Sequence, residues 1–166
     1  MERIMIIGCP GSGKTTLALA LKEKLGLPLI HLDQLWWKGN WENVTREEFD
    51  SRLAMAVNME NWIIDGNFSR TIEMRLQRCA TIIYLDFDRW ECLQGVIHRV
   101  IRNYGKTRPD MGGNCKERFD WDFMKYIWNF NEQNRIRNYT WIAKAPHAKA
   151  IVLKNRKEVK RFLENL

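Results

Sequence analysis

The residues best suited to chemistry lie near the start of the chain, in the segment "GCPGSGKT" at positions 8–15. This segment fits the pattern G-x-x-x-x-G-K-[ST] of a phosphate-binding loop, with an apolar run before it and a helical pattern after it. The glycines let backbone N–H groups face a phosphate, Lys14 would reach the β- and γ-phosphates, and the Thr15 hydroxyl would ligate Mg²⁺. The predicted ATP-binding residues are Gly8, Cys9, Pro10, Gly11, Ser12, Gly13, Lys14, Thr15 and Thr16.

Three carboxylates, Asp33, Asp65 and Asp86, end predicted strands. The carboxyl ends of parallel strands meet at one edge of a sheet, and α/β proteins bind ligands there. Apolar runs predict strands over residues 3–8, 28–33, 62–66, 81–86 and 148–154. Helical patterns alternate with them over residues 14–25, 45–59, 69–79, 90–102, 118–142 and 156–166. This alternation predicts an α/β fold, a three-layer P-loop NTPase domain over residues 1–166 with a mostly parallel five-stranded sheet, helices on both faces and a small lid.

Composition narrows the class of protein. The chain has 166 residues, 45% of them hydrophobic and 28% charged, which is ordinary for a globular domain. Its apolar runs have the length of strands, so no membrane partner is predicted, and no leader is expected because the first predicted strand begins almost at Met1. The four cysteines show no C-x-x-C pairing, which favours reduced thiols and a cytoplasmic location. A net charge of +7 indicates a polyanionic partner, either nucleotide phosphate or nucleic acid.

The segment "WIIDGNFSRT" at positions 62–71 resembles the "DGFPRT" segment of adenylate kinases. The matching positions are Asp65, Gly66, Phe68, Arg70 and Thr71. Asn67 and Ser69 depart from the pattern, since Asn67 precedes the phenylalanine and Ser69 replaces a proline. The order of elements also resembles nucleoside monophosphate kinases over essentially the whole chain. Within that superfamily, the segment "HLDQLWW" with Trp41 after it, "DGNF" and the long aromatic helix over residues 118–142 are together most similar to a bacterial subgroup described as DNA topology modulation proteins (FlaR-like).

The resemblance implies roles for individual side chains. Arg70 would grip the phosphate or carboxylate of a phosphoryl acceptor, Asp65 would hold Mg²⁺ through water, and Asp33 would touch the acceptor. Arg99 and Arg102 would flank the transferring group, and the apolar stripe of their helix also points them away from the core. The predicted catalytic residues are thus Lys14, Asp33, Arg70, Arg99 and Arg102. The structural alternatives are a cap at the strand end for Asp33, a solvated helix face for the last two arginines, and an ion pair for Asp65 and Arg70.

Two segments depart from adenylate kinases. The acceptor-side insert, residues 34–61, is short and is predicted as one loop and one helix, with Trp37 as an acceptor-binding candidate. Of its loop tryptophans Trp36, Trp37 and Trp41, at least two are expected to anchor the loop. The lid segment, residues 103–118, carries Arg108 and Arg118 as candidates to close over a triphosphate, and its one cysteine excludes a four-cysteine zinc site.

Further along the chain, Arg135 is a weaker candidate for reaching the site, since its spacing from Arg118 does not match the adenylate kinase pattern. His31 and His147 belong to no ligand or nucleophile constellation and are interpreted as structural.

These patterns predict an ATP- and Mg²⁺-dependent phosphotransferase that acts on a small molecule. If the acceptor is a nucleoside monophosphate, its phosphate oxygen is already a nucleophile; if it is an alcohol, Asp33 is the natural base. The alternative is an ATP-binding protein that modulates DNA topology by binding nucleic acid. The sequence names neither the acceptor nor the oligomeric state.

Overall fold

The computed structural model describes residues 1–107 and 110–166. Its strands are β1 (Arg3–Gly8), β2 (Leu29–His31), β3 (Trp37–Gly39), β4 (Glu42–Asn43), β5 (Trp62–Asp65), β6 (Thr81–Leu85) and β7 (Lys149–Leu153). Its helices are α1 (Lys14–Leu25), α2 (Leu32–Trp36), α3 (Arg46–Asn58), α4 (Ile72–Leu76), α5 (Arg89–Asn103), α6 (Trp121–Ala143) and α7 (Arg156–Glu164), with a 3₁₀ turn η1 (Ser69–Thr71) before α4.

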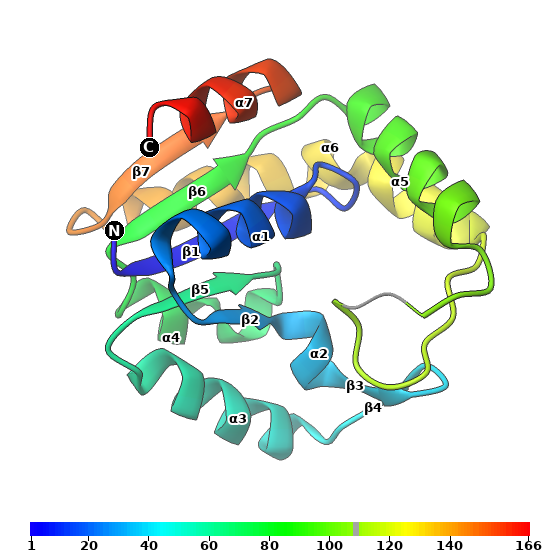
Figure 1. The fold of residues 1–166 in the computed structure, drawn as a ribbon, viewed down its shortest axis with the longest axis horizontal. Coiled ribbons are helices and arrows are strands. Elements are labelled where there is room, and N and C mark those ends of the chain that lie inside the picture. The colour runs from blue at the N-terminus through cyan, green and yellow to red at the C-terminus, as the bar shows by residue number, and fades with distance from the viewer. Residues whose placement is uncertain (108–109) are drawn as a thin grey trace.

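The central sheet has five parallel strands in the order β2-β5-β1-β6-β7 (Figure 1). The predicted five-stranded α/β architecture is therefore confirmed. The chain returns to the sheet through helices because parallel neighbours need crossover connections. The phosphate loop joins the carboxyl end of β1, the middle strand, to the start of α1. This order brings the carboxyl ends of β2, β5 and β6 to the same edge as that loop.

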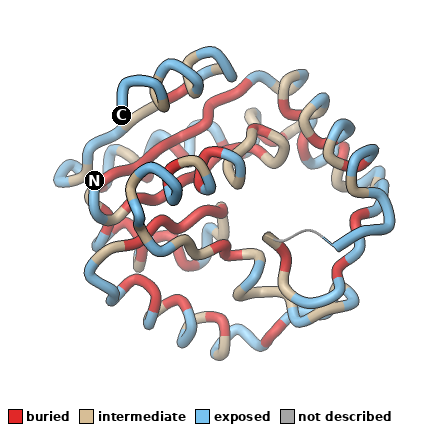
Figure 2. The backbone as a smooth tube through the Cα atoms, in the orientation of Figure 1, coloured by how far each residue is buried: buried red, intermediate tan, exposed pale blue. Residues whose placement is uncertain are grey.

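Alternation along the strands divides the core into two layers. In β1, Ile4 and Ile6 pack on one face with α1, α5, α7 and the first half of α6. Met5 and Ile7 pack on the other face with α3, α4 and the end of α6. Figure 2 shows continuous buried stretches along β1, β5 and β6, as expected for the inner strands of a sheet covered on both faces. No helix among the described residues has the length and apolar character needed to cross a membrane.

The acceptor-side insert differs from its prediction. The expected strand over residues 28–33 ends at His31, so Asp33 closes no strand and instead lies in the first turn of α2. The expected loop contains a short antiparallel hairpin of β3 and β4. The predicted helix that follows is confirmed, and the Thr45 hydroxyl caps it by accepting a hydrogen bond from Glu48 N–H at 3.2 Å.

The lid segment packs against this hairpin. A Cβ added at Gly112 would lie 1.8 Å from the carbonyl oxygen of Trp37, and one at Gly113 would lie 2.0 Å from that of Lys38. Only glycine allows such a close backbone approach. Figure 1 shows the stretch between α5 and α6 reaching across to β3 and β4. The described part of this segment therefore contacts the acceptor-side insert.

Candidate active site

The phosphate loop has the backbone that its glycines predict. Gly11 and Gly13 have φ values of 83° and 92°, a left-handed conformation that glycine adopts without strain. The Lys14 ammonium donates to the carbonyl oxygens of Gly8 and Cys9, both at 3.0 Å. Burial lowers the pKa of Lys14, partly offset by the charges of nearby acidic groups. The lysine is thus folded back onto its own loop.

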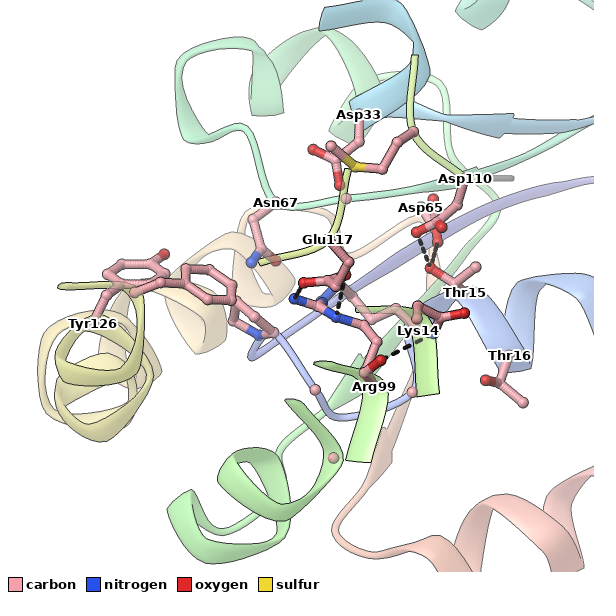
Figure 3. Close-up of a pocket in the computed structure, with 18 of the residues that line it drawn as sticks. Lys14, Thr15, Thr16, Asp33, Asp65, Asn67, Arg99, Asp110, Glu117 and Tyr126 are labelled. Carbon is pink, nitrogen blue, oxygen red and sulfur yellow. Dashed lines mark hydrogen bonds and ion pairs between the residues drawn. The ribbon is translucent and has the colours of Figure 1, made fainter. Parts of the chain in front are cut away.

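A hydroxyl and two carboxylates meet at the start of α1. Thr15 Oγ1 lies 3.2 Å from Asp65 Oδ2 at the end of β5 and 3.3 Å from Asp110 Oδ2 in the lid segment (Figure 3). Oxygen donors of these types suit Mg²⁺, which usually keeps several waters and takes only one or two protein carboxylates beside substrate phosphates. The described residues hold no group of three or more His, Cys, Asp or Glu side chains arranged for a metal. A magnesium ion here would therefore need oxygens from nucleotide and water.

Behind this site, His31 holds Asp65 in place. His31 Nδ1 lies 2.8 Å from Asp65 Oδ1, and both side chains are buried. Burial alone would lower the pKa of His31, but the hydrogen bond to Asp65 and the nearby carboxylate charges raise it above its usual value. The sequence interpretation of His31 as structural thus misses its contact with a site residue.

A cavity of about 1250 Å³ opens around the loop. It is lined by Pro10, Gly11, Gly13, Lys14, Thr15 and Thr16 of the predicted ATP-binding set. Gly8, Cys9 and Ser12 are buried behind them. Among the other predicted site residues, the lining includes Asp33, Trp37, Asp65, Arg99, Arg102 and Arg118. The structure thus brings most of the predicted site together.

Two lid-side arginines already have partners. The Arg99 guanidinium forms an ion pair with the buried carboxylate of Glu117, with Nε 3.1 Å from Oε2. The guanidinium of Arg118 lies 5.3 Å from the centre of the Trp41 ring, a cation–π arrangement. Trp37 contacts Trp41 edge to face, whereas Trp36 packs on Phe49 and Phe68. Trp36 therefore anchors the loop, and Trp37 faces the cavity.

Two candidate arginines lie outside the cavity lining formed by the described residues, and a third cannot be placed. Arg70 is outside the lining formed by the described residues and makes a two-pronged ion pair with Asp50, at 2.7 and 2.5 Å. Arg135 is likewise outside it and pairs with Asp86 at the end of β6, with Nη2 2.7 Å from Oδ2. Arg108 lies outside the described residues. The role predicted for Arg70 would need this side chain to leave Asp50.

The buried Cys9 of the loop has a packing role. It lies in the same apolar cluster as Cys92 of α5. A hydrogen bond with Cys92, together with burial, raises the pKa of Cys9. A protonated, buried thiol of this kind fits the interpretation of a small filler side chain.

Comparison with known proteins places this geometry in a family. Residues 4–99, from β1 into α5, match the family described as AAA domain. The chain belongs to the AAA domain family. The match covers the phosphate loop, the acceptor-side insert and the strand that carries Asp65.

Individual relatives of this AAA domain are kinases. Adenylate kinase of Corynebacterium glutamicum strain R is 33% identical over a stretch covering 43% of this chain and 50% of that protein. Adenylate kinase of Mycolicibacterium paratuberculosis is 33% identical over 40% of each. The chain thus spans about half the length, or less, of the curated relatives it matches. The crystal structure of shikimate kinase from Bacteroides thetaiotaomicron has a TM-score of 0.56 at 18% identity, covering 99% of this chain and 95% of that one, and shows the same fold.

Several residues of this AAA domain reach the site without having been predicted. From the second half of the chain, the lining includes Gly95, Asp110, Glu117, Arg137 and Arg156. Asn67 lines it from the loop after β5. A signal for Asn67 was present, since it is one of the two departures from the adenylate kinase pattern. No local pattern marks the other residues, because they come together through the packing of α5, α6, α7 and the segment between α5 and α6 around the loop.

Proposed function

We propose that this chain is an ATP- and Mg²⁺-dependent kinase that transfers the γ-phosphoryl group of ATP to a small acceptor. The observation that carries the proposal is the size and lining of the cavity. A site for one small ligand usually has a volume of about 300–1000 Å³. The cavity here, at about 1250 Å³, extends from the phosphate loop to Asp33 and Trp37, and so has room for a nucleotide and a second substrate. Relatives named adenylate kinase support the same reaction class.

The negative charge of the phosphates would be neutralised from two sources, basic side chains and a bound metal ion. Lys14 and the arginines of α5, Arg99 and Arg102, would neutralise charge on the transferring phosphoryl group. Mg²⁺, held by Thr15 and through water by Asp65, would supply further neutralisation of the phosphates when bound. Phosphoryl transfer depends on such positioning and charge more than on covalent chemistry.

The acceptor would lie on the side of α2 and the β3–β4 hairpin. Asp33 would act as base for an alcohol, while a nucleoside monophosphate would need none. Trp37 would offer a ring face to the acceptor, and Arg70 would reach it after leaving Asp50. Closure of the lid segment over both substrates would exclude water and suppress ATP hydrolysis.

Formation of ADP from ATP and Mg²⁺ in the presence of nucleoside monophosphates and small alcohols tests the proposal. Acceptor-dependent ADP that Lys14→Ala abolishes is the expected result. Lys22→Ala, which removes an exposed lysine of the same helix, is the matched control and should leave the rate unchanged. A rate that no acceptor raises would contradict the proposal.

Modulation of DNA topology, the activity suggested by the FlaR-like resemblance, stays a prediction. Its support is the net charge of +7. Salt-sensitive binding of duplex DNA, with a steep fall in affinity between low and physiological salt, would favour it. The combination of such binding with no acceptor dependence would replace the kinase proposal.

A further inference from the structure

The side chain of Asn67 makes a reciprocal contact with the first glycine of the phosphate loop. Its Oδ1 accepts a hydrogen bond from Gly8 N–H at 3.1 Å, and its Nδ2 donates to the Gly8 carbonyl oxygen at 2.9 Å. The two residues are 59 positions apart, so this contact joins the loop after β5 to the loop after β1. Gly8 is buried and Asn67 is half-buried at the cavity wall (Figure 3).

The loop that carries Asn67 is fixed from below by a buried arginine. Arg75 has no exposed surface, and its guanidinium donates to the carbonyl oxygens of Gly66, Asn67 and Phe68, at 2.8, 2.6 and 3.0 Å. These bonds hold Phe68 at a φ of 31°, a conformation that is rare for a non-glycine residue. The amide of Asn67 therefore projects from a backbone with little freedom to shift.

The Gly8 carbonyl oxygen is shared between two donors. Lys14 Nζ lies 3.0 Å from it, and Asn67 Nδ2 lies 2.9 Å from it. To reach the phosphates of a nucleotide, Lys14 must give up this bond. A buried carbonyl that loses its only donor is costly, whereas one that keeps a second donor is not. Asn67 is placed to remain on the oxygen when the lysine leaves.

We infer that Asn67 is a positioning residue. It permits Lys14 to release the Gly8 carbonyl oxygen and to bind the phosphates of the nucleotide instead. The inference rests on the proposed function only in taking this cavity as the nucleotide site. Asn67 touches neither the phosphates nor the acceptor in this role; it acts through Gly8 and Lys14.

Calorimetric titration of the full chain with Mg²⁺-ATP tests the inference. Asn67→Asp keeps the acceptor for Gly8 N–H and loses the donor to its carbonyl, while Asn67→Ala loses both without adding charge. Both variants are expected to bind Mg²⁺-ATP about tenfold more weakly, the ratio that corresponds to one buried hydrogen bond. Asn131→Asp is the matched control, because Asn131 Nδ2 also donates to a backbone carbonyl, that of Phe87 at 3.0 Å, outside the cavity lining formed by the described residues. It should keep wild-type affinity even where thermal stability falls.

A double-mutant cycle separates positioning from a general structural effect. In a Lys14→Ala background no ammonium leaves Gly8, so Asn67→Ala should change Mg²⁺-ATP affinity by less than twofold. Additive effects of the two changes, unchanged affinity in Asn67→Ala, or an equal loss in Asn131→Asp would each overturn the inference. Acceptor-dependent turnover together with unchanged Mg²⁺-ATP affinity in the Asn67 variants would overturn the inference and keep the proposed kinase function. Mg²⁺-ATP binding that weakens in the Asn67 variants, without any acceptor-dependent turnover in wild type, would keep the inference and overturn the kinase function.

Discussion

Gly95 of α5 and Gly11 of the phosphate loop touch backbone to backbone. A Cβ added at Gly95 would lie 2.1 Å from the carbonyl oxygen of Gly11, and one at Gly11 would lie 2.1 Å from the carbonyl oxygen of Cys92. A glycine inside a helix costs about 1 kcal/mol relative to alanine. The contact explains why α5 has a glycine at position 95, because only a residue without a side chain lets this helix pack directly against the phosphate loop.

Gly95→Ala should therefore displace the loop. The gain in helix propensity, about 1 kcal/mol, is outweighed by overpacking, which costs about 1–3 kcal/mol in a tight contact. We expect Mg²⁺-ATP affinity to fall by roughly tenfold or more, with a small net loss of thermal stability. Fluorescence or calorimetric titration measures the affinity. Ile101→Ala, at an exposed position of the same helix, is the control and should bind normally.

Local sequence patterns predicted the strands and helices of the central sheet and its covering layers. Each sheet strand is a short apolar run beside a helical period, and those signals depend on nearby residues alone. Asp65 was correctly expected at the end of its strand, next to the loop. Asp33 was not, because the chain turns into α2 one residue after β2 ends, and a three-residue strand gives no signal for its own boundary.

Contacts between segments far apart in the chain could not be predicted from the sequence. His31, Asn67 and Gly95 each contact a residue of another element. A histidine, an asparagine or a glycine can have many roles, so residue type alone did not predict these contacts. Arg70 shows the converse: its position in a family segment suggested a ligand contact, but a carboxylate 20 residues away binds it. Such pairings depend on how α3 packs beside the loop after β5, which neither periodicity nor a motif specifies.

The ion pair of Arg70 and Asp50 should contribute little to stability. Both side chains are more than one-third exposed, and exposed pairs of this kind contribute about 1 kcal/mol or less. Asp50→Asn and Arg70→Ala are expected to shift urea unfolding only slightly. In acceptor-dependent ADP formation they should differ: Arg70→Ala raises the acceptor KM, while Asp50→Asn, which releases the arginine, does not. An acceptor KM that is the same in both variants and in wild type would show that Arg70 forms a surface ion pair and does not contact the acceptor.

Arg75 should be far more important for stability. Burial lowers its pKa to about 9, so it remains charged at neutral pH while it binds three backbone carbonyls. Arg75→Met leaves those oxygens without their donor and should lower the free energy of unfolding by about 3 kcal/mol or more. Arg75→Lys should recover only part, because one ammonium cannot reproduce the planar fork. Chemical denaturation measures both, with the exposed Arg78→Met as control; a loss no larger than that of the control would contradict this role.

His31 should make stability depend on pH. Burial lowers its pKa, but the bond to Asp65 and the charges of Asp65, Asp110 and Asp33 outweigh it, so the folded-state pKa is above the ordinary 6.5. The folded chain then binds the proton more tightly than the unfolded chain. This contribution is fully present below pH 6.5 and is lost as pH rises through the folded-state pKa. In magnesium-free urea unfolding, wild type should therefore exceed His31→Gln most at mildly acidic pH, and the difference should shrink toward alkaline pH. His147→Gln is the control, because His147 is an exposed histidine whose Nε2 lies 3.1 Å from the Leu76 carbonyl oxygen. A difference between wild type and His31→Gln that stays constant with pH would show that the proton on His31 does not stabilise the fold.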